Sequence, residues 1–152
     1  MDQAVTLRIA TPADAEAIGA LTREAYAKWV PLIGREPLPM TVDYAQAVEI
    51  HRFDLLYVGE TLAALIETVP DGDWLLIENV AVHPVFQGRG HGMRLMKLAE
   101  DLAATAGLDG TRLYTNQRFT ENISLYVSLG YRLDSEEVSP VGVRVNMSKA
   151  FG

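Results

Sequence analysis

The chain has 152 residues, 49% of them hydrophobic, which is enough for one domain with a proper core and argues against a disordered chain. Its formal net charge of −7 argues against general nucleic-acid binding, which needs a basic face. It contains no cysteine, which excludes disulfides, thiolate metal sites and a cysteine acyl-enzyme, and is compatible with a cytoplasmic protein. We expect one cytoplasmic domain over residues 1–152.

The ends of the chain and its histidines exclude further classes. The first residues show no basic stretch followed by an apolar one, and no apolar run reaches the ~18 residues of a transmembrane span. His51, His83 and His91 lack metal-ligand spacing. We therefore expect no metal, no membrane and no nucleic-acid partner, while a homodimer is compatible with the sequence.

The first half of the chain predicts two helices among short strands. Threonine as N-cap and proline in the first turn mark the start of the first helix, and a proline-rich segment separates it from the second. In chain order we expect a strand over Val5–Ala10, a helix from Thr11, an irregular segment over Trp29–Thr41, a helix over Val42–Ile50, strands over Phe53–Val58 and Leu62–Val69, and a turn over Pro70–Asp73.

The second half predicts a strand, a glycine loop and a long helix, followed by shorter elements. The helix is amphipathic and ends at Gly107, and a later helix is expected to have Thr120 as its cap. The predicted order is a strand over Trp74–Val82, the loop and its helix, a strand over Thr111–Thr115, a helix over Glu121–Leu129, and strands over Tyr131–Asp134 and Val141–Met147. This order indicates an α/β sandwich around one sheet rather than a regular βαβ array.

The stretch from Val80 to Gly92 is the most informative in the chain. An apolar strand runs into a loop with glycines at 88, 90 and 92, and the loop runs directly into the amphipathic helix. Glycines let the backbone approach a bulky ligand, and free N–H groups at a helix N-terminus favour an anion. The pattern predicts a phosphate-binding loop.

Two familiar phosphate loops do not fit this stretch. A Walker A loop needs Lys-Ser/Thr after its last glycine, but Gly92 is followed by Met93-Arg94. The dinucleotide fingerprint needs a glycine at the sixth position from Gly88, where Met93 stands. What remains is Gln87-x-x-Gly90-x-Gly92 after an apolar strand, and this resembles the acyl-CoA pyrophosphate loop of the GNAT superfamily of N-acetyltransferases.

The resemblance covers most of the chain and implies both a fold and an activity. The fold would be a single-domain GNAT-like α/β fold, with a mixed, mostly antiparallel sheet flanked by helices and with splayed central strands. The activity would be acetyl transfer from acetyl-CoA, the co-substrate, to a primary amine by direct attack in a ternary complex. Residues implied in binding acetyl-CoA are Val80, Ala81, Val82, Gln87, Gly88, Arg89, Gly90, His91, Gly92, Met93, Asn122 and Tyr126.

A second motif lies downstream, in Asn122 to Tyr131. Asn122 and Tyr126 are four residues apart and share one helix face with Leu125 and Leu129. By the resemblance, Asn122 bonds the pantetheine arm and Tyr126 is the general acid that protonates the departing thiolate. Taken alone, Tyr126 could equally be a core tyrosine bonded to a backbone carbonyl.

The reaction also needs a base, because the attacking amine must be neutral. Glu78 is the preferred candidate: it lies in the apolar run Leu75–Val82 and is expected to be in phase with Val80 and Val82. His83 and a water molecule remain alternatives, and Glu78 could also be an exposed residue without a role.

The acceptor is expected to bind against the irregular segment between the first two helices. Long structured loops with aromatic residues are often functional. Arg35 could bind an acceptor carboxylate, whereas the acidic net charge favours a cationic amine, so a small molecule and a peptide amine both remain open. The predicted acceptor-binding residues are Tyr26, Trp29, Ile33, Arg35, Met40 and Tyr114.

Another class of function shares the same loop. A non-catalytic acyl-CoA-binding sensor or accessory subunit would keep the glycine motif but would not need Glu78 or Tyr126. Their presence favours the enzyme. A nucleotide-binding protein is disfavoured, because the loop lacks a Lys-Ser/Thr pair and an acidic metal ligand.

Overall fold

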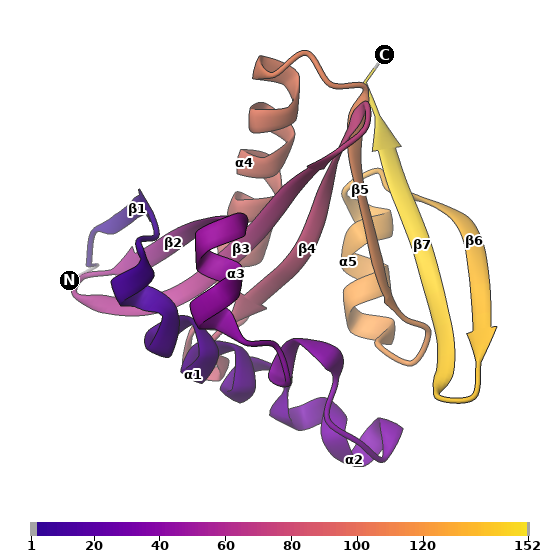
Figure 1. The fold of residues 1–152 in the computed structure, drawn as a ribbon, viewed down its shortest axis with the longest axis horizontal. Helices are drawn as coiled ribbons and strands as arrows, with labels where there is room; N and C mark the ends of the chain where they lie inside the picture. The colour runs from indigo at the N-terminus through magenta and orange to yellow at the C-terminus, as the bar shows by residue number, and fades with distance from the viewer. Residues whose placement is uncertain (1–2, 152) are drawn as a thin grey trace.

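A seven-stranded sheet forms the centre of the protein, of which a computed structural model describes residues 3–151 (Figure 1). The strands are β1 (Val5–Ile9), β2 (Arg52–Val58), β3 (Thr61–Asp71), β4 (Trp74–Val82), β5 (Gly110–Asn116), β6 (Arg132–Ser139) and β7 (Gly142–Ala150). The α-helices are α1 (Ala15–Tyr26), α2 (Val30–Ile33), α3 (Tyr44–Ile50), α4 (His91–Thr105) and α5 (Thr120–Ser128). Short 3-10 turns cover Pro12–Asp14, Ala27–Trp29, Leu38–Met40 and Pro84–Phe86.

The sheet is mixed and mostly antiparallel, as predicted. The strand order is β1-β2-β3-β4-β5-β7-β6, and β4 with β5 is the parallel pair among neighbours that are otherwise antiparallel. Helices α1 and α3 pack on one face through Ile18 and Val48, and α4 packs on the other through Leu95 and Met96 (Figure 1). The result is a three-layer domain with a core on each side of the sheet.

The two central strands separate part-way along their length. Pairing between β4 and β5 runs from Trp74 with Gly110 to Ile77 with Leu113, although β4 continues to Val82 and β5 to Asn116. Beyond Ile77, one edge of β4 therefore has no neighbouring strand. The predicted splay of the central strands is confirmed, and Figure 1 shows β5 turning away from β4.

A β-bulge lies at the same place in β4. Glu67 of β3 pairs with Asn79 and Thr68 pairs with Ile77, so Glu78 is the extra residue. A bulge shifts the alternation of side chains by one position. Ile77 and Val80 consequently both face the core beneath α4. The expectation that Glu78 is in phase with Val80 is wrong, because the bulge places Glu78 beside Asn79 on the face covered by α1 and α3.

Several element boundaries also differ from the predictions. The segment over Trp29–Thr41, expected to be irregular, contains α2 and a 3-10 turn, and Gly34 ends α2 with a φ of 75°. Helix α3 begins at Tyr44 rather than Val42, because the Asp43 side chain accepts hydrogen bonds from the first backbone N–H groups. Phe119, not Thr120, is the N-cap of α5.

Candidate active site

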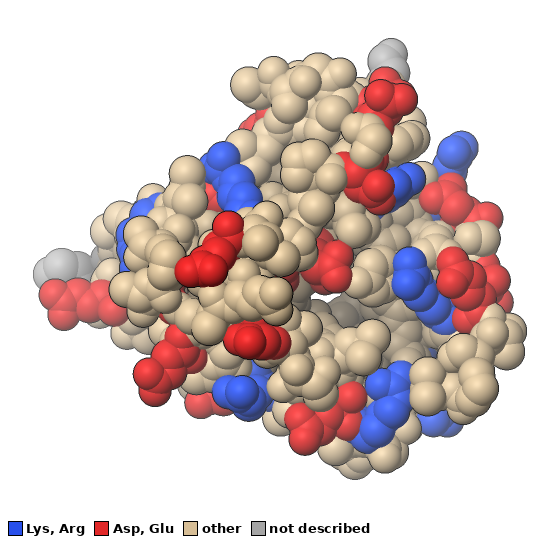
Figure 2. Space-filling view, viewed as in Figure 1, with Lys and Arg blue, Asp and Glu red and all other residues tan. Residues whose placement is uncertain are grey.

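Two cavities adjoin the opening between β4 and β5. The loop cavity, about 400 Å³, lies between the end of β4, residues 86–93 and α5. The hairpin cavity, about 410 Å³, lies between the segment from α1 to α3, strands β4 and β5, and the β6–β7 hairpin. Figure 2 shows a hollow near the centre of the face of the molecule onto which the hairpin cavity opens. Tyr26 lines both cavities, and the consecutive residues Asn79 and Val80 line one each, so the two spaces meet at this point.

The glycine loop brings backbone N–H groups into the loop cavity. Gly88 and Gly90 have φ values of 78° and 82°, a conformation that other residues adopt only under strain. Gly90 is the N-cap of α4, and the first backbone hydrogen bond of the helix runs from Arg94 N–H to Gly90 O. The preceding N–H groups of the first turn are left without intrahelical partners, which suits an anion.

The free edge of β4 forms another wall of the loop cavity. Val80, Ala81 and Val82 line it beyond the point where β5 separates. The Gln87 side chain donates from Nε2 to Val82 O over 3.1 Å, which fixes the start of the loop to the end of the strand. Unpaired strand groups can accept an extended ligand through main-chain hydrogen bonds.

Tyr126 of α5 lines the same cavity as the β4 edge. Its ring packs 6.1 Å from the ring of Tyr131, and burial alone raises the pKa of its hydroxyl to about 12. Among residues 3–151, no side chain or backbone group forms a hydrogen bond with this hydroxyl. A half-buried phenol that keeps its proton at neutral pH and has an unused O–H can act as a proton donor.

The inner end of the hairpin cavity carries a network of phenols and polar groups. The Tyr114 hydroxyl donates to Glu78 Oε1 over 2.5 Å, and the Tyr26 hydroxyl donates to Asn79 Oδ1 over 2.9 Å. Burial, followed by the bond to Glu78, raises the pKa of Tyr114. Burial also raises the pKa of Tyr26, with smaller contributions from nearby groups that include Tyr126. Both phenols are therefore protonated donors at neutral pH.

Glu67 is a second carboxylate in this cavity, and it was missed in the sequence. It lies on β3, only 3% exposed, and its Oε2 is 2.6 Å from Nδ1 of His51. Burial raises the pKa of Glu67, the bond to His51 opposes that rise, and the charge of Glu78 adds to it. The available signal was an acid within the apolar run of β3, the same signal that pointed to Glu78.

Comparisons with known proteins agree with this geometry. The sequence profile of the acetyltransferase (GNAT) family matches residues 20–131, which is most of the chain. The chain belongs to the GNAT acetyltransferase family. No curated protein matches it in a sequence comparison.

Solved structures share the whole fold of this GNAT protein. The PaiA N-acetyltransferase of Thermoplasma acidophilum, in complex with coenzyme A, has a TM-score of 0.83 at 17% identity, over 97% of this chain and 99% of that one. The ribosomal-protein-S18-alanine N-acetyltransferase of Escherichia coli has a TM-score of 0.79 at 21% identity, over 97% and 94% of the two chains. At these identities the likeness shows the fold alone.

The structure of this GNAT protein gathers most of the residues expected to bind acetyl-CoA. Arg89 lies outside the lining of the loop cavity, with its guanidinium carbon 5.4 Å from the centre of the Phe86 ring. The expected residues that line the loop cavity are Val80, Ala81, Val82, Gln87, Gly88, Gly90, His91, Gly92, Met93, Asn122 and Tyr126.

The residues expected to bind the acceptor are divided between three places. Tyr26, Ile33, Arg35 and Tyr114 line the hairpin cavity, as does Glu78. Trp29 instead lines the loop cavity and stacks on Phe119 at 4.6 Å between ring centres. Met40 lies outside both linings, at the end of the 3-10 turn Leu38–Met40.

His83 lines neither of the two cavities. Its Nδ1 accepts from Val85 N–H over 3.1 Å, and its Nε2 pairs with Glu24 of α1. Both ring nitrogens are thus occupied in fixing the loop. Among residues 3–151, no three His, Asp or Glu side chains gather as metal ligands do, and no helix is long and apolar enough to cross a membrane.

Proposed function

We propose that this protein transfers an acetyl group from acetyl-CoA to a primary amine by direct attack in a ternary complex. The observation that carries the proposal is the junction of the two cavities at Tyr26, beside the free edge of β4. A donor in the loop cavity and an acceptor in the hairpin cavity would meet at this junction. Holding both reactants together replaces a bimolecular step with an effectively unimolecular one.

The loop cavity suits the pyrophosphate and the pantetheine arm of acetyl-CoA. The N–H groups before Arg94 would bind the pyrophosphate, and the open edge of β4 near Val80 and Val82 would pair with the pantetheine amides. Asn122, which lines the same cavity, would bond the pantetheine arm. The thioester would then lie between β4 and Tyr126.

The chemistry requires one proton acceptor and one proton donor. The amine nitrogen attacks the thioester carbon, the C–S bond breaks, and the thiolate leaves. Glu78 takes the proton of the amine, directly or through a water, from the hairpin-cavity side. Tyr126 gives its proton to the thiolate from the loop-cavity side, and its pKa of about 12 keeps that proton available at neutral pH.

The substitution Tyr126→Phe tests the acid. We expect turnover, measured as thiol release from acetyl-CoA, to fall about 100-fold or more, with little change in the affinity for CoA. Tyr131→Phe is the matched control, because Tyr131 packs against Tyr126 and its hydroxyl bonds Thr111 at 2.6 Å. That variant should lose stability but keep turnover. Unchanged turnover in Tyr126→Phe would exclude Tyr126 as the acid.

A panel of primary amines tests the activity itself. Thiol release with at least one amine supports the enzyme. Tight CoA binding without thiol release for any amine would instead favour the non-catalytic sensor or accessory subunit.

A further inference from the structure

Charged side chains of both signs line the hairpin cavity: Glu67, Glu78 and Glu137, with Arg35 and Arg144. At its inner end, Glu67 and Glu78 line the wall formed by the sheet, close enough for the charge of Glu78 to act on Glu67. The neighbouring tyrosines are hydrogen-bond donors without charge at neutral pH. The sheet wall therefore offers negative charge to a ligand that enters from the hairpin side.

Arg35 supplies the opposite charge from the segment after α2. Its Nη2 donates to Val141 O over 3.2 Å, its Nη1 donates to Glu36 O over 3.4 Å, and its Nε is buried without a partner. Both bonds are to backbone carbonyls, and no carboxylate of residues 3–151 forms an ion pair with this guanidinium. A guanidinium has five N–H donors in a fork that matches a carboxylate.

The other arginine of this cavity is already occupied. Arg144 lies over the ring of Tyr114 at 3.9 Å from the ring centre, its Nε donates to Asn146 Oδ1 over 3.3 Å, and Asn146 in turn donates to Glu137. Because Tyr114 bonds Glu78, Arg144 lies at the acidic end of the cavity, whereas Arg35 is the cation that the segment after α2 offers to a ligand carboxylate.

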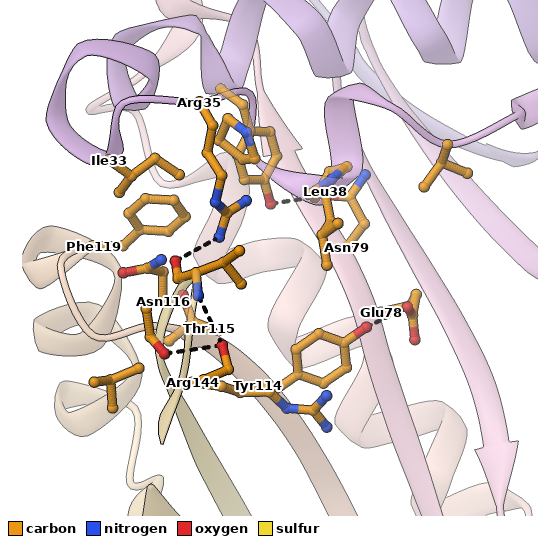
Figure 3. Close-up of a pocket in the computed structure, with 18 of the residues that line it drawn as sticks. Ile33, Arg35, Leu38, Glu78, Asn79, Tyr114, Thr115, Asn116, Phe119 and Arg144 are labelled. Atoms are coloured by element: carbon orange, nitrogen blue, oxygen red, sulfur yellow. Dashed lines mark hydrogen bonds between the residues drawn. The ribbon is translucent and has the colours of Figure 1, made fainter. Parts of the chain in front are cut away.

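Apolar side chains line the part of the cavity between Arg35 and Glu78. Figure 3 shows Arg35 near Ile33 and Phe119, apart from Glu78, with Leu38 and Tyr114 between them. Arg35 comes from the segment after α2 and Glu78 from β4, so the two charged groups belong to different walls of the cavity. A ligand that meets both needs an apolar body between its charges.

The size of the cavity and the bridges across it favour a small ligand. Its volume of about 410 Å³ falls within the range of small-molecule sites. Arg35 joins the segment after α2 to the β6–β7 hairpin, and Arg118 donates from Nη1 to Leu32 O over 2.8 Å nearby. These two contacts join the α2 segment to the β6–β7 hairpin and to the turn before α5.

We propose that the acceptor is a small amino-carboxylate, with a primary amine and a carboxylate at the two ends of an apolar body. The ammonium group binds between Glu67 and Glu78, and the carboxylate binds Arg35. This proposal rests on the proposed acetyl transfer and names its acceptor class. It brings together two features of the sequence, Arg35 and the acidic charge, that point to different ligands when each is considered alone.

Matched pairs of amines test the class. Aminohexanoate is compared with hexylamine, and aminomethylbenzoate with benzylamine, by thiol release from acetyl-CoA. We expect each amino-carboxylate to have a kcat/KM about tenfold to a hundredfold above that of its partner without the carboxylate, as one charged hydrogen-bond pair provides. Equal values within both pairs, or faster reaction of a peptide N-terminus, would overturn the acceptor class.

Arg35→Gln tests the residue, and Arg118→Gln is its control. Both arginines donate to a backbone carbonyl far away in the sequence, but Arg118 lies outside the cavity lining. Arg35→Gln should raise the KM for aminohexanoate about tenfold or more and leave hexylamine unchanged, and Arg118→Gln should leave both unchanged. Equal effects of Arg35→Gln on both amines would contradict carboxylate recognition. Failure of every amine would contradict the proposed function instead, so the two failures are distinguishable.

Discussion

The charges of the hairpin cavity are set by neighbours rather than by the acids alone. Tyr114 and Tyr26 donate to the polar groups of the sheet wall, and burial raises the pKa of Tyr44 to about 12, so the phenols stay protonated. Tyr114 and Tyr26 thus donate hydrogen bonds to the sheet wall without adding charge to it. The carboxyl group of Glu67 differs from the phenols, because burial raises its pKa and so favours its neutral form.

Glu67→Gln should alter how stability depends on pH. A carboxyl whose pKa is higher in the folded than in the unfolded state binds its proton more tightly when folded. The wild type therefore loses stability relative to the variant as pH rises from about 4.5 through the folded pKa of Glu67. Urea unfolding of both proteins at several pH values measures this difference.

Asp14→Asn is a control of opposite sign. Arg8 lowers the pKa of Asp14 to about 2 through paired hydrogen bonds. The stability that Asp14 contributes is present above its unfolded pKa and is lost as pH falls through about 2, so this variant should be destabilised at neutral pH. A pH-independent difference between wild type and Glu67→Gln would contradict the raised pKa of Glu67.

The sequence predicted part of this site and missed part for identifiable reasons. Glu78 and Tyr114 could be proposed because each stands in a recognisable strand, but their hydrogen bond depends on the bulge. Glu67 was overlooked because its run on β3 is read as core, and nothing local shows that Asn79 lies opposite it. Met40 was proposed from composition, which does not determine the direction of a side chain.

At the scale of elements, the paired end of β4 and β5, from which the two strands separate, depends on one glycine. Gly110 pairs with Trp74 where the two strands meet, and it also pairs with Ala150 of β7. A Cβ at this position would meet the Lys149 carbonyl oxygen, and the Trp74 ring at 2.8 Å. The close approach of three strands here holds β5 while its far end turns away.

Gly110→Ala should therefore destabilise the fold by about 1–3 kcal/mol, the usual cost of overpacking. Gly19→Ala, in α1, is the control. A Cβ there would make only ordinary contacts with Arg23 and Tyr44, at 3.5 Å or more. Since alanine favours a helix, that variant should be neutral or more stable by up to about 1 kcal/mol. Denaturant midpoints compare the two. Equal stabilities would show that β4, β5 and β7 can shift without cost.

Elements with one buried face were predictable, and those without one were not. The periodicity of α4 fixed its position closely, because Leu95, Met96 and Ala99 all face the core. Strand β6 was predicted to end at Asp134, but it extends to Ser139. All of its residues are exposed, so no alternation of apolar and polar residues marks its length. The bulge at Glu78 likewise requires knowledge of the pairing with β3.

For the whole molecule, the proposed function would give donor and acceptor separate approaches through the two cavities. The loop cavity is bordered by α4 and α5, and the hairpin cavity by the segment from α1 to α3 and the β6–β7 hairpin. Direct transfer, as proposed, requires that both ligands be bound together, and two separate cavities would allow this. The loop cavity also draws on residues of α1, β4, α4 and α5, so a ligand there contacts both layers of helices.

CoA binding should stabilise the whole fold, and the effect should depend on Gly90. At a free CoA concentration about a hundred times Kd, unfolding should cost about 2.7 kcal/mol more than without ligand. Gly90 and Gly72 both have positive φ, 82° and 61°, and a Cβ at either would meet open space. Alanine at either position should cost a similar ~1–2 kcal/mol in the ligand-free protein.

Only Gly90→Ala should reduce the stabilisation by CoA, because Gly90 lines the loop cavity, whereas Gly72 lies in the turn between β3 and β4. Thermal unfolding with and without CoA, for the wild type and both variants, measures the difference. Equal stabilisation in Gly90→Ala and Gly72→Ala would place the pyrophosphate away from the glycine loop. Loss in Gly90→Ala alone would instead mean that this backbone conformation, which only glycine adopts without strain, holds the donor in place.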